Sequence, residues 1–394
     1  MPAYLFTLLL GLTGPLQFGT NLPTTAPNNA VNQVECILFE MGAPFQLQTL
    51  PWLRARREVK LERLDGYFTT HLMPEMKAYG RISSPIFLES WYWFTHPESI
   101  NKPKNKMRYG AVRGSYQANW FKTQNIIAEV EVNSLEEIVN VMHHKRIDRI
   151  LLDLDDFELA ASKLGINKDE YQKEFFRYVP LGLFASHSLI KRLPEFMQQF
   201  DENINTCAQA PFSLSKSEET QILDRLYSSA KTLLNLPSLV EEVQISNESP
   251  LSEPEIMKRD QLWIKESKHV GHADGLTMLD LPLSKVFKKW QSQFKGVVTE
   301  LILTDSQGKN IAISKLTSDY WQGDENKFTK IFKQSKDYNF DSVTYDASTH
   351  HFQVQLSFPV LDNNSHIGVL ILGVDVEKAL HSQTKRVTNS IPFT

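Results

Sequence analysis

Hydrophobic residues in the first part of the chain recur alternately at strand and at helical spacing. Residues 32–42 place Val34, Ile37, Leu38 and Met41 on one helical face, and short apolar runs of strand length stand on either side. We expect strands at 16–21, 45–50 and 64–69, with helices at 32–42 and 53–62. This alternation of strands and helices predicts a parallel sheet covered by helices.

A second unit of the same kind follows. Ser134 and Glu137 have the spacing of a capping box ahead of an apolar helical face, and Ser115 is a suitable residue to cap another helix. We expect strands at 109–112, 128–132, 147–154 and 178–184. Two such units, joined by the aromatic-rich stretch 91–99, predict two lobes with a hinge.

The pattern changes after Cys207. Residues 210–216 read as a linker, and residues 217–236 form a long amphipathic helix. From Val297 onward, short apolar runs alternate with turn clusters such as SQGK and DNNSH. This second half, residues 217–394, is therefore expected to be an α+β domain with an antiparallel sheet.

The start of the chain carries an apolar stretch of its own. Tyr4 to Leu12 reads YLFTLLLGL, which has the length of a signal-peptide core and is too short to span a bilayer. We expect residues 1–14 to be a signal peptide and the mature protein to be soluble and periplasmic. A buried first strand is the alternative for this stretch.

Composition narrows the class of function. The chain has 394 residues, 41% of them hydrophobic and 22% charged, which are globular proportions, and its net charge of −4 provides no basic surface for nucleic acid. Two cysteines without a CxxC motif give no thiolate metal site, and we expect no metal and no cofactor. Cys36 and Cys207 could be joined in an exported protein, but their spacing does not decide whether they are.

Four segments of the first half occur in the order found in one protein family. They are PWLRARREVKLERLDGYF, ISSPI, GAVRGSY and RIDRILLD. With them, residues 15–209 resemble the bacterial extracellular solute-binding proteins of family 3, the polar amino-acid type. The resemblance implies an α/β Venus-flytrap domain, with lobe 1 at about 15–93 and 186–209 and lobe 2 at about 98–182.

The same resemblance implies a ligand site between the lobes. Gly114 and Ser115 open a helix whose N-terminus would bind a carboxylate, and Asp153 would bind an ammonium group. Helix capping is the alternative role for both Ser115 and Asp153. The other candidate ligand-binding residues are Arg113, Ser84, Trp91, Trp93 and Arg54, and core packing is the alternative for the two tryptophans. The family's arginine before the S-x-P strand is replaced by Met76, which argues against an ordinary α-amino acid as ligand.

The second half resembles a single Cache-type sensor domain. The resemblance rests on a D-x-x-W step at Asp260 and Trp263, the string TSDYWQGDE at 317–325, and a final strand IGVLILGVDV. It implies a second small-molecule pocket, for which the candidates are Asp319, Tyr320, Trp321 and Asp324. A purely structural turn is the alternative for this string.

These expectations combine into one functional hypothesis. The chain is expected to be an exported, non-enzymatic binding protein that captures a small polar solute, which could bear an amine, and presents it to a membrane transporter or a signalling receptor. The rival is an enzyme on the same scaffold, similar to cyclohexadienyl dehydratases, with Asp153 or Glu89 as general acid. An interaction module without a ligand is the third alternative.

Overall fold

The computed structural model describes residues 14–22, 29–207, 212–267, 273–346 and 351–381. It divides into two compact units, Met1–Ala210 and Pro211–Thr394, which are described separately below. The expected signal peptide lies outside the described residues, apart from Gly14. Within the described part, no helix is both long and apolar enough to cross a membrane.

The first lobe of unit 1 is built on a sheet with the order β2-β1-β3-β9, where β9 is Gln172–Ser186, and β4 also pairs with β9. Strands β1, β2 and β3 run parallel, as the alternating pattern predicts, because the helices between them return the chain to the same edge. The elements are β1 (Leu16–Thr20), α1 (Asn29–Glu40), β2 (Phe45–Thr49), α2 (Trp52–Lys60), β3 (Gly66–Thr70) and β4 (Gly80–Ile82).

The second lobe repeats this plan with the strand order β9-β5-β8-β6-β7, where β5 is Phe87–Thr95. Its helices begin where the sequence places capping residues: the Ser115 and Ser134 hydroxyls each accept a bond from a backbone N–H of the following turn. The elements are β6 (Tyr109–Val112), α3 (Tyr116–Thr123), β7 (Ala128–Val132), α4 (Leu135–His143), β8 (Arg149–Asp153) and α5 (Leu154–Leu164).

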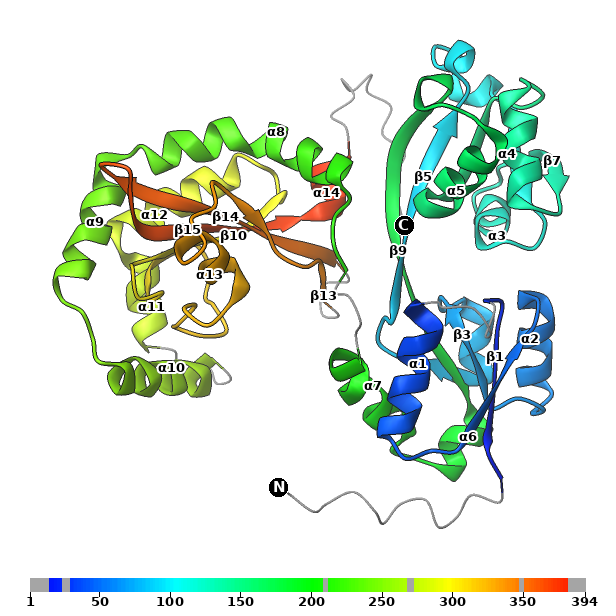
Figure 1. The fold of residues 1–394 in the computed structure, drawn as a ribbon, viewed down its shortest axis with the longest axis horizontal. Coiled ribbons are helices and arrows are strands. Elements are labelled where there is room, and N and C mark those ends of the chain that lie inside the picture. Colours follow the sequence, from blue (N-terminus) through cyan, green and yellow to red (C-terminus); the bar gives the residue numbers. More distant parts are fainter. Residues whose placement is uncertain (1–13, 23–28, 208–211, 268–272, 347–350, 382–394) are drawn as a thin grey trace. The chain divides into compact units, whose positions relative to one another are not determined.

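Two long strands run through both lobes. Strand β9 (Gln172–Ser186) pairs with β5 (Phe87–Thr95) over its first part and with β3 and β4 over its last part. Figure 1 shows β5 and β9 side by side as the connection between the two lobes. The expected two-lobed α/β fold is therefore confirmed for this unit, and the hinge consists of these crossing strands.

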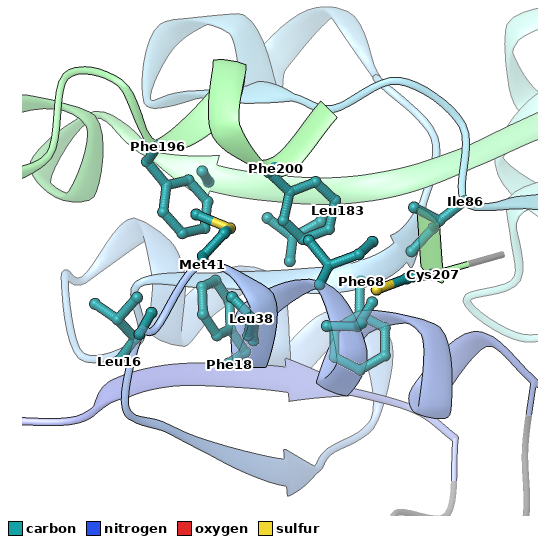
Figure 2. Packing of buried hydrophobic residues seen from close by; sticks show 14 of the residues in the cluster. Leu16, Phe18, Leu38, Met41, Phe68, Ile86, Leu183, Phe196, Phe200 and Cys207 are labelled. Atoms are coloured by element: carbon teal, nitrogen blue, oxygen red, sulfur yellow. The ribbon is translucent and has the colours of Figure 1, made fainter. Parts of the chain in front are cut away.

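The core of lobe 1 lies between its sheet and helices α1, α6 (His187–Arg192) and α7 (Phe196–Cys207). In Figure 2, Phe196 and Phe200 of α7 extend toward Phe18 and Leu38, and all four side chains are buried. A disulfide between Cys36 and Cys207 joins α1 to α7, with their Cα atoms 5.7 Å apart. The open question about these cysteines is thereby answered in this structure.

Unit 2 contains an antiparallel sheet with the order β11-β10-β15-β14-β12, and β13 pairs with β14. Its strands are β10 (Val298–Thr304), β11 (Asn310–Ile313), β12 (Asn339–Phe340), β13 (Thr344–Asp346), β14 (His351–Asp362) and β15 (Ser365–Asp375). Its helices are α8 (Lys216–Leu234), α9 (Pro237–Glu248), α10 (Glu253–Ser267), α11 (Ala273–Asp280), α12 (Pro282–Ser292), α13 (Asn326–Phe332) and α14 (Val376–Leu380). This arrangement is the α+β class that the turn-separated apolar runs predict.

Candidate functional site

The middle of β5 lies where the two lobes of unit 1 meet. Trp91 on β5 pairs with Asp153 on β8 at one side and with Arg177 on β9 at the other. Directly paired residues place their side chains on the same face of a sheet, so these three form a row across the hinge. Glu89 lies two residues before Trp91 on the same face of β5.

The lobes contact each other directly through Tyr116, the first residue of α3. Its hydroxyl lies 2.6 Å from Oγ1 of Thr70 at the end of β3, and either oxygen can donate this hydrogen bond. Its ring centroid lies 4.1 Å from that of His71 and 5.1 Å from that of Trp52, both on lobe 1. The structure therefore shows a closed arrangement in which one lobe-2 side chain is held by three from lobe 1.

Two buried polar atoms at this junction have no hydrogen-bond partner in the described part of the chain. They are Nδ1 of His71 and Nε of Arg56, a residue of α2. The Arg56 guanidinium carbon lies 5.8 Å from the centre of the Tyr116 ring. Because most buried polar atoms in proteins are hydrogen-bonded, orphaned atoms between two lobes indicate a place where a ligand can supply the missing partners.

His71 is neutral at this junction. Burial, followed by the positive charges of Arg177 and Arg56, lowers the pKa of its imidazole to about 4. One of its two ring nitrogens then carries a proton and the other accepts one. His71 can therefore donate a hydrogen bond to an anion without adding a charge.

Two carboxylates lie on the other side of Trp91. The Trp91 indole donates a 2.8 Å hydrogen bond from Nε1 to Oε2 of Glu89. Burial, and then the nearby charge of Asp153, raises the pKa of Glu89, and burial, followed by the charge of Asp156, raises that of Asp153. This end of the site can accept hydrogen bonds or bind a cation.

Asp153 has structural partners in this closed form. One carboxylate oxygen accepts from the backbone N–H groups of Asp155 and Asp156 at 3.0 and 3.2 Å, which caps α5, and the other accepts from that of Ser90 at 2.8 Å. The alternative role as a helix cap is therefore observed, and contact with a ligand remains a prediction. Ser115 likewise caps α3 by accepting from Ala118 N at 3.1 Å.

Gly114 lies against lobe 1. Its φ of +75° is in the left-handed region, and a Cβ atom built there would lie 3.4 Å from a methyl group of Leu53 on α2. The Gly114–Ser115 turn therefore faces the other lobe, as a ligand-binding helix start must, although α2 already covers it here.

Three of the remaining candidates of unit 1 make other contacts, and the fourth is exposed. Arg113 donates from Nη1 to the Asn133 side chain at 3.1 Å, and Ser84 donates its N–H to Asp201 at 2.8 Å. Trp93 stacks on Phe121 in the core of lobe 2, with Arg149 over its ring, so the core-packing alternative describes it. Arg54 is exposed on α2.

The residues that sequence reasoning missed are Arg56, Thr70, His71, Tyr116 and Arg177. Arg56 stands among the similar residues Arg54 and Arg57, and Arg177 stands in a mixed polar stretch. No local pattern distinguishes them, because their role depends on neighbours far away in the sequence.

In unit 2, the string at 317–325 folds back on the turn between β10 and β11. Nε1 of Trp321 donates to the Gln307 carbonyl at 2.7 Å, and the Gln322 side chain donates to Asp319 at 2.6 Å. One oxygen of Asp260 accepts from the backbone N–H groups of Tyr320 and Trp321 at 2.9 and 3.0 Å. The turn alternative therefore accounts for Asp319 and Trp321, while Asp324 is exposed.

Of the four unit 2 candidates, Tyr320 lines a cavity formed by described residues of this unit. The cavity has a volume of about 340 Å³. Arg259 and Asp274 contribute opposite charges to its wall, and burial raises the pKa of Tyr320 while Arg259 lowers it. The wall is completed by Trp263, Thr277, Met278 and Leu281.

A scan against models of protein families and a search of curated proteins both find no match for this chain. Solved structures are similar to about half of it. The GluR0 ligand-binding core from Nostoc punctiforme, in complex with L-glutamate, is 15% identical with a TM-score of 0.41 and covers 49% of this chain and 92% of its own. The amino acid ABC transporter substrate-binding protein AbpA from Streptococcus pneumoniae, bound to L-arginine, is 12% identical with a TM-score of 0.39 and covers 49% and 88%. A histidine kinase sensor domain similar to periplasmic binding proteins is 9% identical with a TM-score of 0.41 and covers 49% and 89%. The two-lobed fold described above rests on the strand order and contacts of this chain itself.

Proposed function

We propose that this protein is an exported ligand-binding protein that captures a small polar solute between the two lobes of unit 1. The observation that supports this most directly is the pair of orphaned polar atoms, Nδ1 of His71 and Nε of Arg56, at the junction of the lobes. A solute between the lobes supplies the partners that the folded chain does not.

Capture follows from movement about the crossing strands. Opening at β5 and β9 separates Tyr116 from Thr70 and His71 and admits the solute, and closure buries it against both lobes, as in hinge-bending binding proteins. A solute that contacts both lobes stabilises the closed form by its difference in affinity for the two forms. The closed form is then what a membrane transporter or signalling receptor recognises.

We further propose that unit 2 is a Cache-like sensor domain with its own ligand in the cavity beside Tyr320. Arg259 and Asp274 stand in its wall and match a small solute with both an acidic and a basic group. Arg259→Gln should weaken binding of a solute in this cavity. Lys258→Gln, at an exposed neighbouring position of the same helix, is the matched control.

Native mass spectrometry of the gently purified full chain tests the proposal. The expected result is a bound small molecule that is released on denaturation. Hydrogen exchange, measured with and without that molecule, should then show slower exchange in α2 of lobe 1 and α3 of lobe 2 together, because the solute bridges them. Repeated preparations that carry no solute, or protection confined to one lobe, contradict capture between the lobes.

The carboxylate pair Glu89 and Asp153 favours the enzyme alternative to a limited extent. Their raised pKa values leave a protonated carboxyl group available near neutral pH, as a general acid requires. Incubating the full chain with a cyclohexadienyl acid distinguishes the two functions. We expect no turnover, and turnover that Glu89→Gln abolishes would replace the binding function with catalysis.

A further inference from the structure

Arg56 differs from two other arginines of unit 1 that are at least partly buried. Arg149, which is 4% exposed, forms an ion pair with Glu174, and Arg108 forms one with Asp148 at 3.1 Å. Arg56 is half-buried between the lobes, and its Nη1 points at the weak acceptor Sδ of Met73 at 3.3 Å. No carboxylate in the described part of the chain forms an ion pair with it, although a buried charge is costly without a partner.

Arg177 presents a second guanidinium to the same junction. It lies on β9 opposite Trp91, and its guanidinium carbon is 5.8 Å from the centre of the Trp91 ring. Among the described residues it too has no acidic partner. Stacking on an aromatic ring fixes the plane of a guanidinium while leaving its N–H groups free to bind a carboxylate.

His71 lies between these two arginines. The centroid of its ring lies 4.1 Å from that of Tyr116, the ring over which Arg56 lies. It lies 6.5 Å from that of Trp91, edge-on, and Arg177 lies over the Trp91 ring. The charges of both arginines act on its imidazole. Its buried Nδ1 has no partner in the described chain and can donate a third hydrogen bond.

We propose that the inter-lobe site is specific for a small organic acid whose carboxylate is held by Arg56 of lobe 1, Arg177 of β9 and Nδ1–H of His71. This inference rests on the proposed function and adds the chemical class of the solute. The acid also couples binding to closure, because it contacts groups of both lobes and so stabilises the closed form. Beyond Trp91, burial raises the pKa of Glu89 to about 8, so its carboxyl group is protonated near neutral pH and can donate a hydrogen bond to a second carboxylate of the solute.

Three four-carbon probes test the proposal on the full chain by calorimetry: succinate with two carboxylates, succinamide with two neutral amides, and 1,4-diaminobutane with two ammonium groups. We expect succinate to bind, succinamide to bind at least about 30-fold more weakly, and the diamine not to bind, because the site pairs cations with the probe's charge.

Two variants and one control show which arginines bind the carboxylate of succinate. Arg56→Gln should weaken succinate binding about 30-fold or more, whereas Arg177→Gln, at an exposed position, should weaken it about 3- to 10-fold. Arg57→Gln removes an exposed arginine from the same helix and should leave the affinity unchanged. Without probe, both variants should melt at the temperature of the unmodified protein, because neither arginine has an acidic partner to lose in the described chain. If Arg56→Gln fails to fold, Arg177→Gln carries the test.

Equal binding of succinate and succinamide overturns the inference, as does equal affinity of the Arg56→Gln, Arg177→Gln and Arg57→Gln proteins. Failure of succinate to bind overturns it as well. In each case a non-acidic solute found between the lobes by mass spectrometry and hydrogen exchange leaves the proposed function standing. Only the absence of any solute between the lobes contradicts both the inference and the proposed function.

Discussion

The inter-lobe junction of unit 1 and the 317–325 string of unit 2 are both rich in aromatic and charged residues, yet their polar groups are used differently. In the string, Trp321 and the backbone at Tyr320 are bonded to other parts of unit 2, and the Asp319 side chain accepts a bond from Gln322 within the string. At the junction, Arg56 and Arg177 have no acidic partner in the described chain, Nδ1 of His71 has no hydrogen-bond partner there, and the charges of both arginines act on His71. The first pattern stabilises a fold, and we propose that the second binds a ligand.

The atoms left unpaired in unit 2 support this distinction. They include the buried amide oxygens of Asn310 and Gln322, which are neutral and which a single water molecule can serve. Those of the junction belong to a guanidinium and an imidazole. Four experiments test this difference between the two regions.

The buried ion pair of unit 2 should be the most sensitive point of its turn. Nζ of Lys309 lies 3.1 Å from Asp305, and their side chains are 5% and 0% exposed. Lys309→Met leaves Asp305 buried without its cation and should reduce the free energy of unfolding by about 3–5 kcal/mol. Urea unfolding measures this, with Arg177→Met as the control that should change stability by about 0.5 kcal/mol or less. Equal losses in the two variants would contradict the comparison.

Asp260 should have the next largest effect, because it fixes the string from outside. Asp260→Ala removes the acceptor of two backbone N–H groups, those of Tyr320 and Trp321. We expect a loss of about 1–3 kcal/mol in urea unfolding. Asp324→Ala, at an exposed acid of the same string, should be neutral, and a similar loss there would mean that the network is not what stabilises the turn.

The pH dependence of unit 1 should report on His71. Its pKa of about 4 in the folded state lies below its ordinary 6.5, so its contribution is fully present above pH 6.5 and is lost as the pH falls toward 4. Because the ring is only half-buried, we expect a loss of about 1–2 kcal/mol. Glu89 and Asp153 act in the opposite direction over an overlapping range, since their raised pKa values cost stability as the pH rises from about 4 to about 8.

Comparing His71→Phe with the unmodified protein in thermal unfolding between pH 4 and 8 separates the two contributions. The variant should lack the loss of stability that His71 causes below pH 6.5 (the acid limb), and its pH dependence above 6.5 should be unchanged. An acid limb that is unaffected by this change would place the imidazole in water, outside the closed junction.

Much of the fold could be predicted from local pattern. The bounds of β6 and β7 match their predicted ranges, and Ser115 and Ser134 cap helices as expected, because capping depends on residues three positions apart. Strand β9 was predicted only over 178–184 but extends over Gln172–Ser186. Its first residues, including Lys173, Glu174 and Arg177, lack strict apolar alternation and become a strand by pairing with β5.

The candidate site could be predicted less well. Trp91 stood out through its aromatic neighbours, and Asp153 through its position at the end of an apolar strand, where the structure also shows its capping role. Arg56 and Arg177 are 121 positions apart in the chain, and only the tertiary fold brings them around His71. A binding site assembled from such distant residues has no signature in any one segment.

The smallest effect should come from the hydrogen bond that joins the lobes, and it tests whether the junction is closed in solution. Tyr116→Phe removes the hydroxyl that lies 2.6 Å from Thr70, and should cost about 0.5–1.5 kcal/mol of unit 1 stability. Thr70→Val should cost a similar amount. Since Thr70 also contacts Tyr67, the two variants must be combined in a double-mutant cycle.

If the bond forms, the double variant loses less stability than the sum of the losses of the single variants, by about the energy of the bond. If the losses add, the lobes stand apart without a solute, and the unpaired groups of Arg56 and His71 are then hydrated until one binds. The same cycle repeated with saturating succinate should then recover the coupling, because the acid draws Tyr116 and Thr70 together.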